Sequence, residues 1–210
     1  MASWQSTLVY LALAVPAIPF VVAGIRFARL STPQKWLFLL LGFTLLSNSA
    51  SQLLPEFDLP NLWIFHIYVL VDFALLTLVF RELVPKRLAI GAISLFTTMG
   101  IFLLFWDGGW KGLPSVTMGV EAFWMVFLTF WYFWKVYREM KILRLERQFL
   151  FWFGTGNLLY FSGNLLLFIF SNYIIGQSPT LAIQIWMANV VLIFLRILFY
   201  TIALAWKDPA

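Results

Sequence analysis

Long apolar runs alternate along the chain with short polar stretches that contain most of its charged residues and prolines. Each run is close to the roughly 20 residues that an α-helix needs to cross about 30 Å of hydrocarbon. The runs are continuously apolar, whereas the strands of a membrane barrel alternate between polar and apolar residues. The pattern therefore predicts an all-α membrane protein whose residues 1–210 form one helical-bundle domain. The seven predicted transmembrane spans are residues 7–28, 36–54, 62–80, 88–106, 116–134, 149–170 and 181–206.

Composition supports a membrane protein and excludes several other classes. Of the 210 residues, 62% are hydrophobic and only 11% are charged, against about 45–50% and about 25% in soluble domains. The chain has no cysteine and one histidine, which excludes a disulfide framework, a cysteine-based metal site and a haem held by two histidines of one chain. The local motifs of phosphate-binding loops, nucleophile elbows and zinc proteases are also absent from the sequence.

Basic residues are unevenly divided between the two sides of the predicted bundle. One side holds Lys111 alone, beside the acidic Glu56 and Asp58. Lys and Arg favour cytoplasmic loops, so we predict an outside N-terminus and a cytoplasmic C-terminus. The net charge of +5 then reflects topology and anionic lipid, and we expect no nucleic-acid partner. The basic side contains Arg26, Arg29, Lys35, Arg81, Lys86, Arg87, Lys135, Arg138, Lys141, Arg144, Arg147 and Lys207.

Four ionisable side chains lie inside the predicted spans: His66, Asp72, Glu121 and Arg196. A charge at mid-membrane costs about 3 kcal/mol on insertion scales, so such groups are candidates for function. Asp72 lies about 17 Å deep counted from Asn61, and Arg196 about 22 Å deep counted from Leu181. These similar depths predict an ion pair between the third and seventh spans. The pair could lock the bundle together or form the floor of a binding site.

Uncharged polar residues recur at helical spacing in three of the spans. Within each span they share one helical face, which must avoid lipid. Small polar residues on such a face are also typical of helix packing, so a purely structural role is the alternative. The residues are Thr44, Ser47, Asn48, Ser51 and Gln52 in the second span, Asn157, Tyr160 and Asn164 in the sixth, and Asn189 and Tyr200 in the seventh.

Many of the polar side chains fall in the predicted outer half of the membrane, a bias that packing alone does not explain. We therefore predict a cavity that opens outward, has Asp72 and Arg196 at its floor and binds a small molecule. We expect neither a metal ion nor a cofactor there. The candidate ligand-binding residues are Asn48, Gln52, His66, Asp72, Glu121, Asn157, Asn164, Asn189 and Arg196.

The fifth predicted span is unusually aromatic. Between Phe123 and Tyr137 nine of fifteen residues are aromatic, and they are spread around the whole helix. Residues on every side of one helix cannot all face one flat ligand, so we expect most of them to contact lipid.

One segment resembles a known group of proteins. Residues 61–73, which read NLWIFHIYVLVDF, are similar to the third helix of small seven-helix bacterial inner-membrane proteins. The resemblance implies a bacterial inner membrane and brings no assigned activity. Rhodopsins and G-protein-coupled receptors share the seven-helix plan, but the last span has no lysine for a retinal Schiff base. PQ-loop transporters share the plan and the dipeptide Pro33-Gln34, without a matching proline between residues 135 and 147.

Short loops leave little mass outside the membrane, which favours a sensor or receptor-like protein that signals through a cytoplasmic or membrane partner. The alternatives are a small-solute or proton-coupled transporter, a lipid-modifying enzyme and a structural subunit of a membrane complex. A set formed by His66, Asp72 and Glu121 could serve catalysis, but the first two lie about 120° apart on their helix. Shared chemistry is therefore not expected, and a non-catalytic role is favoured.

Overall fold

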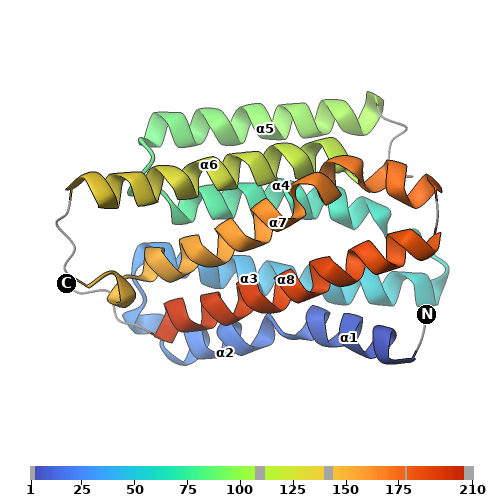
Figure 1. The fold of residues 1–210 in the computed structure, drawn as a ribbon, viewed down its shortest axis with the longest axis horizontal. Helices are drawn as coiled ribbons and strands as arrows, with labels where there is room; N and C mark the ends of the chain where they lie inside the picture. Colours follow the sequence, from blue (N-terminus) through green and yellow to red (C-terminus); the bar gives the residue numbers. More distant parts are fainter. Residues whose placement is uncertain (1–2, 107–111, 140–143, 178, 206–210) are drawn as a thin grey trace.

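The computed structural model describes residues 3–106, 112–139, 144–177 and 179–205. Every regular element within those residues is a helix, and seven segments are long and apolar enough to cross a membrane. The long helices lie side by side along the longest axis of the molecule (Figure 1). The predicted all-α, seven-span bundle is therefore confirmed.

The helices follow the predicted spans, with short 3-10 turns between some of them. Helices α6 and α7 extend at least one turn past the predicted spans, because their ends continue beyond the apolar run into polar residues. The helices are α1 (Ser3–Ala14), α2 (Ala17–Ile25), α3 (Thr32–Leu53), α4 (Leu62–Val79), α5 (Lys86–Trp106), α6 (Ser115–Glu139), α7 (Phe149–Gln177) and α8 (Pro179–Ala205), and the turns are η1 (Phe27–Arg29), η2 (Leu54–Phe57) and η4 (Leu145–Arg147).

The first span is not the single helix that the sequence pattern predicted, but two helices, α1 and α2, that meet at Pro16. Proline has no backbone N–H, and its ring collides with the carbonyl four residues earlier in a continuous helix. The chain turns at Val15 and Pro16 and resumes as α2 from Ala17. The break leaves backbone carbonyls of α1 without their usual helical donors.

Six of the spans form a closed ring around the interior of the bundle. Following the contacts around it, α2 packs on α3, α3 on α4, α4 on α6, α6 on α7, α7 on α8, and α8 on α1 and α2. Helix α5 lies outside this ring against α4 and α6, at the edge of the bundle (Figure 1). Most of its side chains face away from the protein, as expected of a helix that is solvated largely by lipid.

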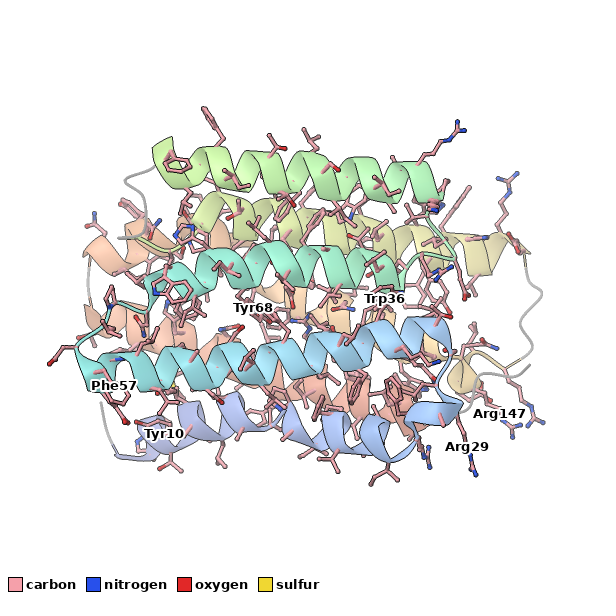
Figure 2. The ribbon with its side chains drawn as sticks, turned by 180° about the vertical axis from the view of Figure 1, so that it is seen from behind. Tyr10, Arg29, Trp36, Phe57, Tyr68 and Arg147 are labelled. Carbon is pink, nitrogen blue, oxygen red and sulfur yellow. The ribbon has the colours of Figure 1, made fainter. Side chains whose placement is uncertain are left out.

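The two ends of the bundle differ in charge. Arg29 and Arg147 lie together at one end, while Tyr10 and Phe57 lie at the other (Figure 2). We call the first the basic end and the second, where α1 begins, the N-terminal end. Lys111, Lys141 and Lys207 lie outside the described residues. Which end faces the cytoplasm stays a prediction from the loop charges.

Large buried side chains fill the bundle toward the basic end. Phe153 of α7 is at their centre, with its ring centroid 5.3 Å from that of Phe80, 5.6 Å from that of Phe149 and 5.2 Å from that of Tyr200. All four are fully buried or nearly so. The interior is therefore closed on this side, and the space that remains lies toward the N-terminal end.

Candidate ligand-binding cavity

A cavity of about 550 Å³ lies inside the ring, lined by α1, α3, α4, α6, α7 and α8. It reaches the N-terminal end, where the exposed side chains of Gln52 and Ile175 line it, and extends inward to Leu40 and Tyr200. Sites for small molecules in proteins are typically about 300–1,000 Å³. The cavity is therefore of a size to hold a small organic molecule.

Helix α3 turns its polar face toward this space. Thr44, Ser47, Asn48, Ser51 and Gln52 all line the cavity, as their spacing of three and four residues allows. On the opposite side of the same helix Leu46 is 67% exposed and faces outward. The polar stripe is thus turned inward and the apolar side outward, which is the arrangement that a lipid surrounding requires.

Asn48 has a second role in the fold. Its Nδ2 donates a hydrogen bond of 2.9 Å to the backbone carbonyl of Leu13 in α1. This carbonyl lies at the break before Pro16, where the helix supplies no donor for it in the described structure. Asn48 therefore stabilises the broken first span while the same residue lines the cavity.

The floor of the cavity is formed by the ion pair that the sequence predicted. Arg196 Nη2 lies 3.7 Å from Asp72 Oδ2, and both side chains are buried. The two residues come from α8 and α4, which approach across the interior of the ring. Their similar depths along two different spans are the reason that they meet.

Arg196 is held in place by neighbours on two helices. Its Nε donates to the hydroxyl of Tyr200 at 2.7 Å, and that hydroxyl donates to Oδ1 of Asn157 at 2.6 Å. The guanidinium also lies over the rings of Tyr160 and Phe161, at 4.6 and 5.0 Å from their centroids. Stacking and hydrogen bonding together fix the orientation of the positive charge.

Glu121 of α6 joins this pair as a third ionisable group. Its carboxyl group lies beside that of Asp72, it lines the cavity, and it is only 3% exposed. Within the described part of the chain, Glu121 Oε1, Asp72 Oδ1 and Arg196 Nη2 have no hydrogen-bond partner. The floor is thus a cluster of two carboxyl groups and one guanidinium, which we call the charged floor.

Not every predicted site residue reaches the cavity. His66 lies elsewhere, with its Nε2 3.1 Å from the carbonyl oxygen of Gly112, beside a small pocket of about 20 Å³. Asn164 is buried but is not part of the cavity lining. Asn157 acts through Tyr200, as described above. Asn48, Gln52, Asp72, Glu121, Asn189 and Arg196 are the predicted residues that do line the cavity.

Three tyrosines that are not among the predicted ligand-binding residues also line the cavity: Tyr68, Tyr160 and Tyr200. Tyr68 lies in the middle of the bundle (Figure 2), four residues before Asp72 and therefore on the same face of α4. Tyr200 has the same relation to Arg196. A search for residues four positions from each buried charge would have found both.

Most of the aromatic side chains between Phe123 and Tyr137 of α6 face outward, as expected of side chains that contact lipid. Phe123, Phe127, Phe130 and Trp134 are each between 46% and 66% exposed, and none of them is among the cavity residues.

In the described ranges, no three His, Asp or Glu side chains form a group that could hold a metal ion. The cavity is the feature of the described structure best suited to hold a ligand.

No protein-family model, no curated protein and no solved structure matches this chain.

Proposed function

We propose that this protein is a heptahelical membrane sensor or receptor-like protein, which binds a small molecule in the cavity and signals through a partner. The observation that carries the proposal is a cavity that reaches one end of the bundle and stops at the charged floor in mid-membrane. Beyond the floor, packed aromatic side chains close the interior. A site that is accessible from one face only suits detection of a molecule better than its passage.

We further propose that the cavity opens on the outer face of a bacterial inner membrane. The basic end then faces the cytoplasm, as the excess of Lys and Arg there favours. Because the loops are short, a signal has to pass to a second protein, either in the membrane or at the basic loops. The segment of residues 61–73 is the support for a bacterial source.

Thiol labelling tests access to the cavity, since the chain has no native cysteine. Ser47→Cys is nearly isosteric and places a thiol on the cavity wall. Thr129→Cys is the matched control, because Thr129 is fully buried on α6 and is not among the cavity residues. A small membrane-impermeant methanethiosulfonate reagent, added to intact cells or to inverted vesicles, should label Ser47→Cys from the outside only and leave Thr129→Cys unlabelled.

The orientation is checked separately with thiols in exposed loops. Leu59→Cys lies at the N-terminal end and Glu82→Cys at the basic end. Labelling of the first in intact cells, and of the second only after permeabilisation, is the expected result. The reverse pattern would invert the membrane orientation and with it the face on which the cavity opens.

A small-solute or proton-coupled transporter is the second candidate, and the break at Pro16 is the observation that favours it. Broken helices beside a mid-membrane site are typical of transporters, and both Leu13 and Pro16 line the cavity. A transporter must also expose its site to the cytoplasm. Labelling of Ser47→Cys from both faces would therefore replace the sensor proposal by the transporter, and labelling from neither face would refute both.

A further inference from the structure

The charges at the floor of the cavity balance only when one of its two carboxyl groups carries a proton. Asp72 and Glu121 can each carry one negative charge, while Arg196 carries one positive charge at any physiological pH. The cavity lining has no other Arg, Lys or His among the described residues. With both carboxyl groups ionised, the charged floor has an excess of one negative charge in a medium where an uncompensated charge is costly.

Two carboxylate oxygens of the floor also need hydrogen-bond donors. Glu121 Oε1 and Asp72 Oδ1 accept no hydrogen bond from the residues that the structure describes, although these side chains are only 3% and 2% exposed. Both residues line the cavity. Since ionised carboxylates act only as acceptors, the group that completes these two oxygens must be a donor. Arg196 Nη2, the third unpaired atom of the floor, is itself a donor and lies 3.7 Å from Asp72 Oδ2 in the ion pair.

The rest of the cavity is mainly apolar. Between the charged floor and the N-terminal end its walls include Val69, Met118, Trp186 and Ile193. A ligand that satisfies the floor therefore lies along apolar walls for the remainder of its length. This combination requires a molecule with one polar end and one apolar body.

We propose that the ligand is an amphipathic organic cation, with a primary or secondary ammonium group attached to an apolar body. The ammonium group donates to Glu121 and Asp72 and supplies the missing positive charge, while the apolar body lies against the walls. The inference rests on the proposed function, because it names the ligand class of the same cavity.

Anionic, quaternary and neutral ligands fit the charged floor less well than a primary or secondary ammonium group. An anion would have to compete with Asp72 for Arg196 and would add a third negative charge to the cluster. A quaternary ammonium group supplies charge but has no N–H to donate. A neutral ligand leaves the excess charge in place, unless a proton on one carboxyl group already removes it.

Four probes of matched size separate these possibilities. They are 4-phenylbutylammonium, 4-phenylbutan-1-ol, 4-phenylbutanoate and the zwitterion 2-amino-4-phenylbutanoate. Binding is measured by isothermal titration on the full chain in nanodiscs of zwitterionic lipid, with empty nanodiscs as the blank. Because a hydrogen bond between charged groups is a strong one, we expect the ammonium probe to bind at least about tenfold more tightly than the other three.

A variant at Glu121 and a matched control test whether the preference for the ammonium probe arises at the charged floor. Glu121→Gln keeps the shape of the side chain and removes one negative charge from the floor, so the tenfold preference should be lost. Glu56→Gln makes the same change at an exposed position, and it should leave the preference intact. The comparison of the four probes on the unaltered protein depends on no variant, so it stands even if Glu121→Gln folds poorly.

The proposal is overturned if the alcohol binds as tightly as the ammonium probe, which would mean that a proton already neutralises the floor. It is equally overturned if the anion or zwitterion binds best, if Glu121→Gln keeps the preference, or if no probe binds. Where Ser47→Cys is nevertheless labelled from the outside, only the ligand class fails and the proposed function stands. Where that labelling also fails, both are refuted.

Discussion

Replacing Arg196 should destabilise the bundle more than replacing either carboxyl group of the charged floor. Arg196→Met keeps much of the apolar stem and leaves Asp72 and Glu121 side by side without a cation. At an effective dielectric constant of about 20, unit charges at the 3.7 Å separation of this ion pair attract by about 4.5 kcal/mol. Loss of one partner of a buried pair typically costs about 3–5 kcal/mol, so we expect the free energy of unfolding to fall by about 4 kcal/mol.

Asp72→Asn should be milder, because Glu121 remains to neutralise Arg196. We expect a loss of about 2 kcal/mol, the worth of one hydrogen bond to a charged group. For an isolated ion pair, the double variant Asp72→Asn with Arg196→Met would recover most of the loss. Here it leaves Glu121 as a lone buried carboxyl group, so recovery should require Glu121→Gln as a third change.

Unfolding by sodium dodecyl sulfate in mixed micelles, followed by far-ultraviolet circular dichroism, measures these free energies for the single, double and triple variants. The interaction energies then come from the mutant cycle. The exposed pair of changes Glu56→Gln and Arg29→Met should leave stability within about 0.5 kcal/mol. A cost of Arg196→Met no greater than that of Asp72→Asn, or full recovery of stability in the double variant, would show that the three groups do not form one charge cluster.

Two further predictions concern the helices that carry the cavity, and the same unfolding measurement checks both. Asn48→Leu removes the donor to the carbonyl of Leu13 and should lower the free energy of unfolding by about 1 kcal/mol. In a Pro16→Ala background the helix can supply its own donor to that carbonyl, so Asn48→Leu should cost less there. Equal costs in the two backgrounds would show that Asn48 does not act on the break. Gly156→Ala would place a Cβ 2.9 Å from Cβ of Phe199 and should cost about 1–3 kcal/mol by forcing α7 and α8 apart. Gly91→Ala, whose Cβ would meet nothing within 4 Å beyond its chain neighbours and the backbone of its own helix, should be neutral or stabilising by up to about 1 kcal/mol. Similar effects of the two changes would refute a tight α7–α8 contact.

The seven spans and the inward polar face of α3 could be predicted from the sequence because lipid imposes simple rules. A helix must hide its backbone polar groups and present apolar side chains outward, and both requirements appear as local patterns in the chain. Asp72 and Arg196 could be paired because each is a lone charge in its span at a similar depth. The local sequence pattern is sufficient to predict a feature wherever contact with lipid determines the type of residue. It is not sufficient where contact with one particular side chain does so.

The contact between Glu121 and Asp72 could not be predicted in this way. Counted from the helix starts, Glu121 lies about 9 Å into α6 and Asp72 about 15 Å into α4, yet their carboxyl groups are adjacent. The helices begin at different levels, which depth counting ignores. For His66 the sequence did contain the needed signal, since its angle of about 120° from Asp72 on α4 turns it away from the cavity.

Stability alone does not account for the charged floor. A buried ion pair is often no more stabilising than well-packed apolar residues of the same volume, and a floor with two acids and one base is less favourable still. The residues around Phe153 show that this chain can fill a bundle interior with aromatic side chains and no charged group. Asp72, Glu121 and Arg196 instead stand where that packing ends and the cavity begins. Their cost is offset most simply by a ligand that binds there, which is why the cavity, rather than the packing of the helices, supports the proposed function.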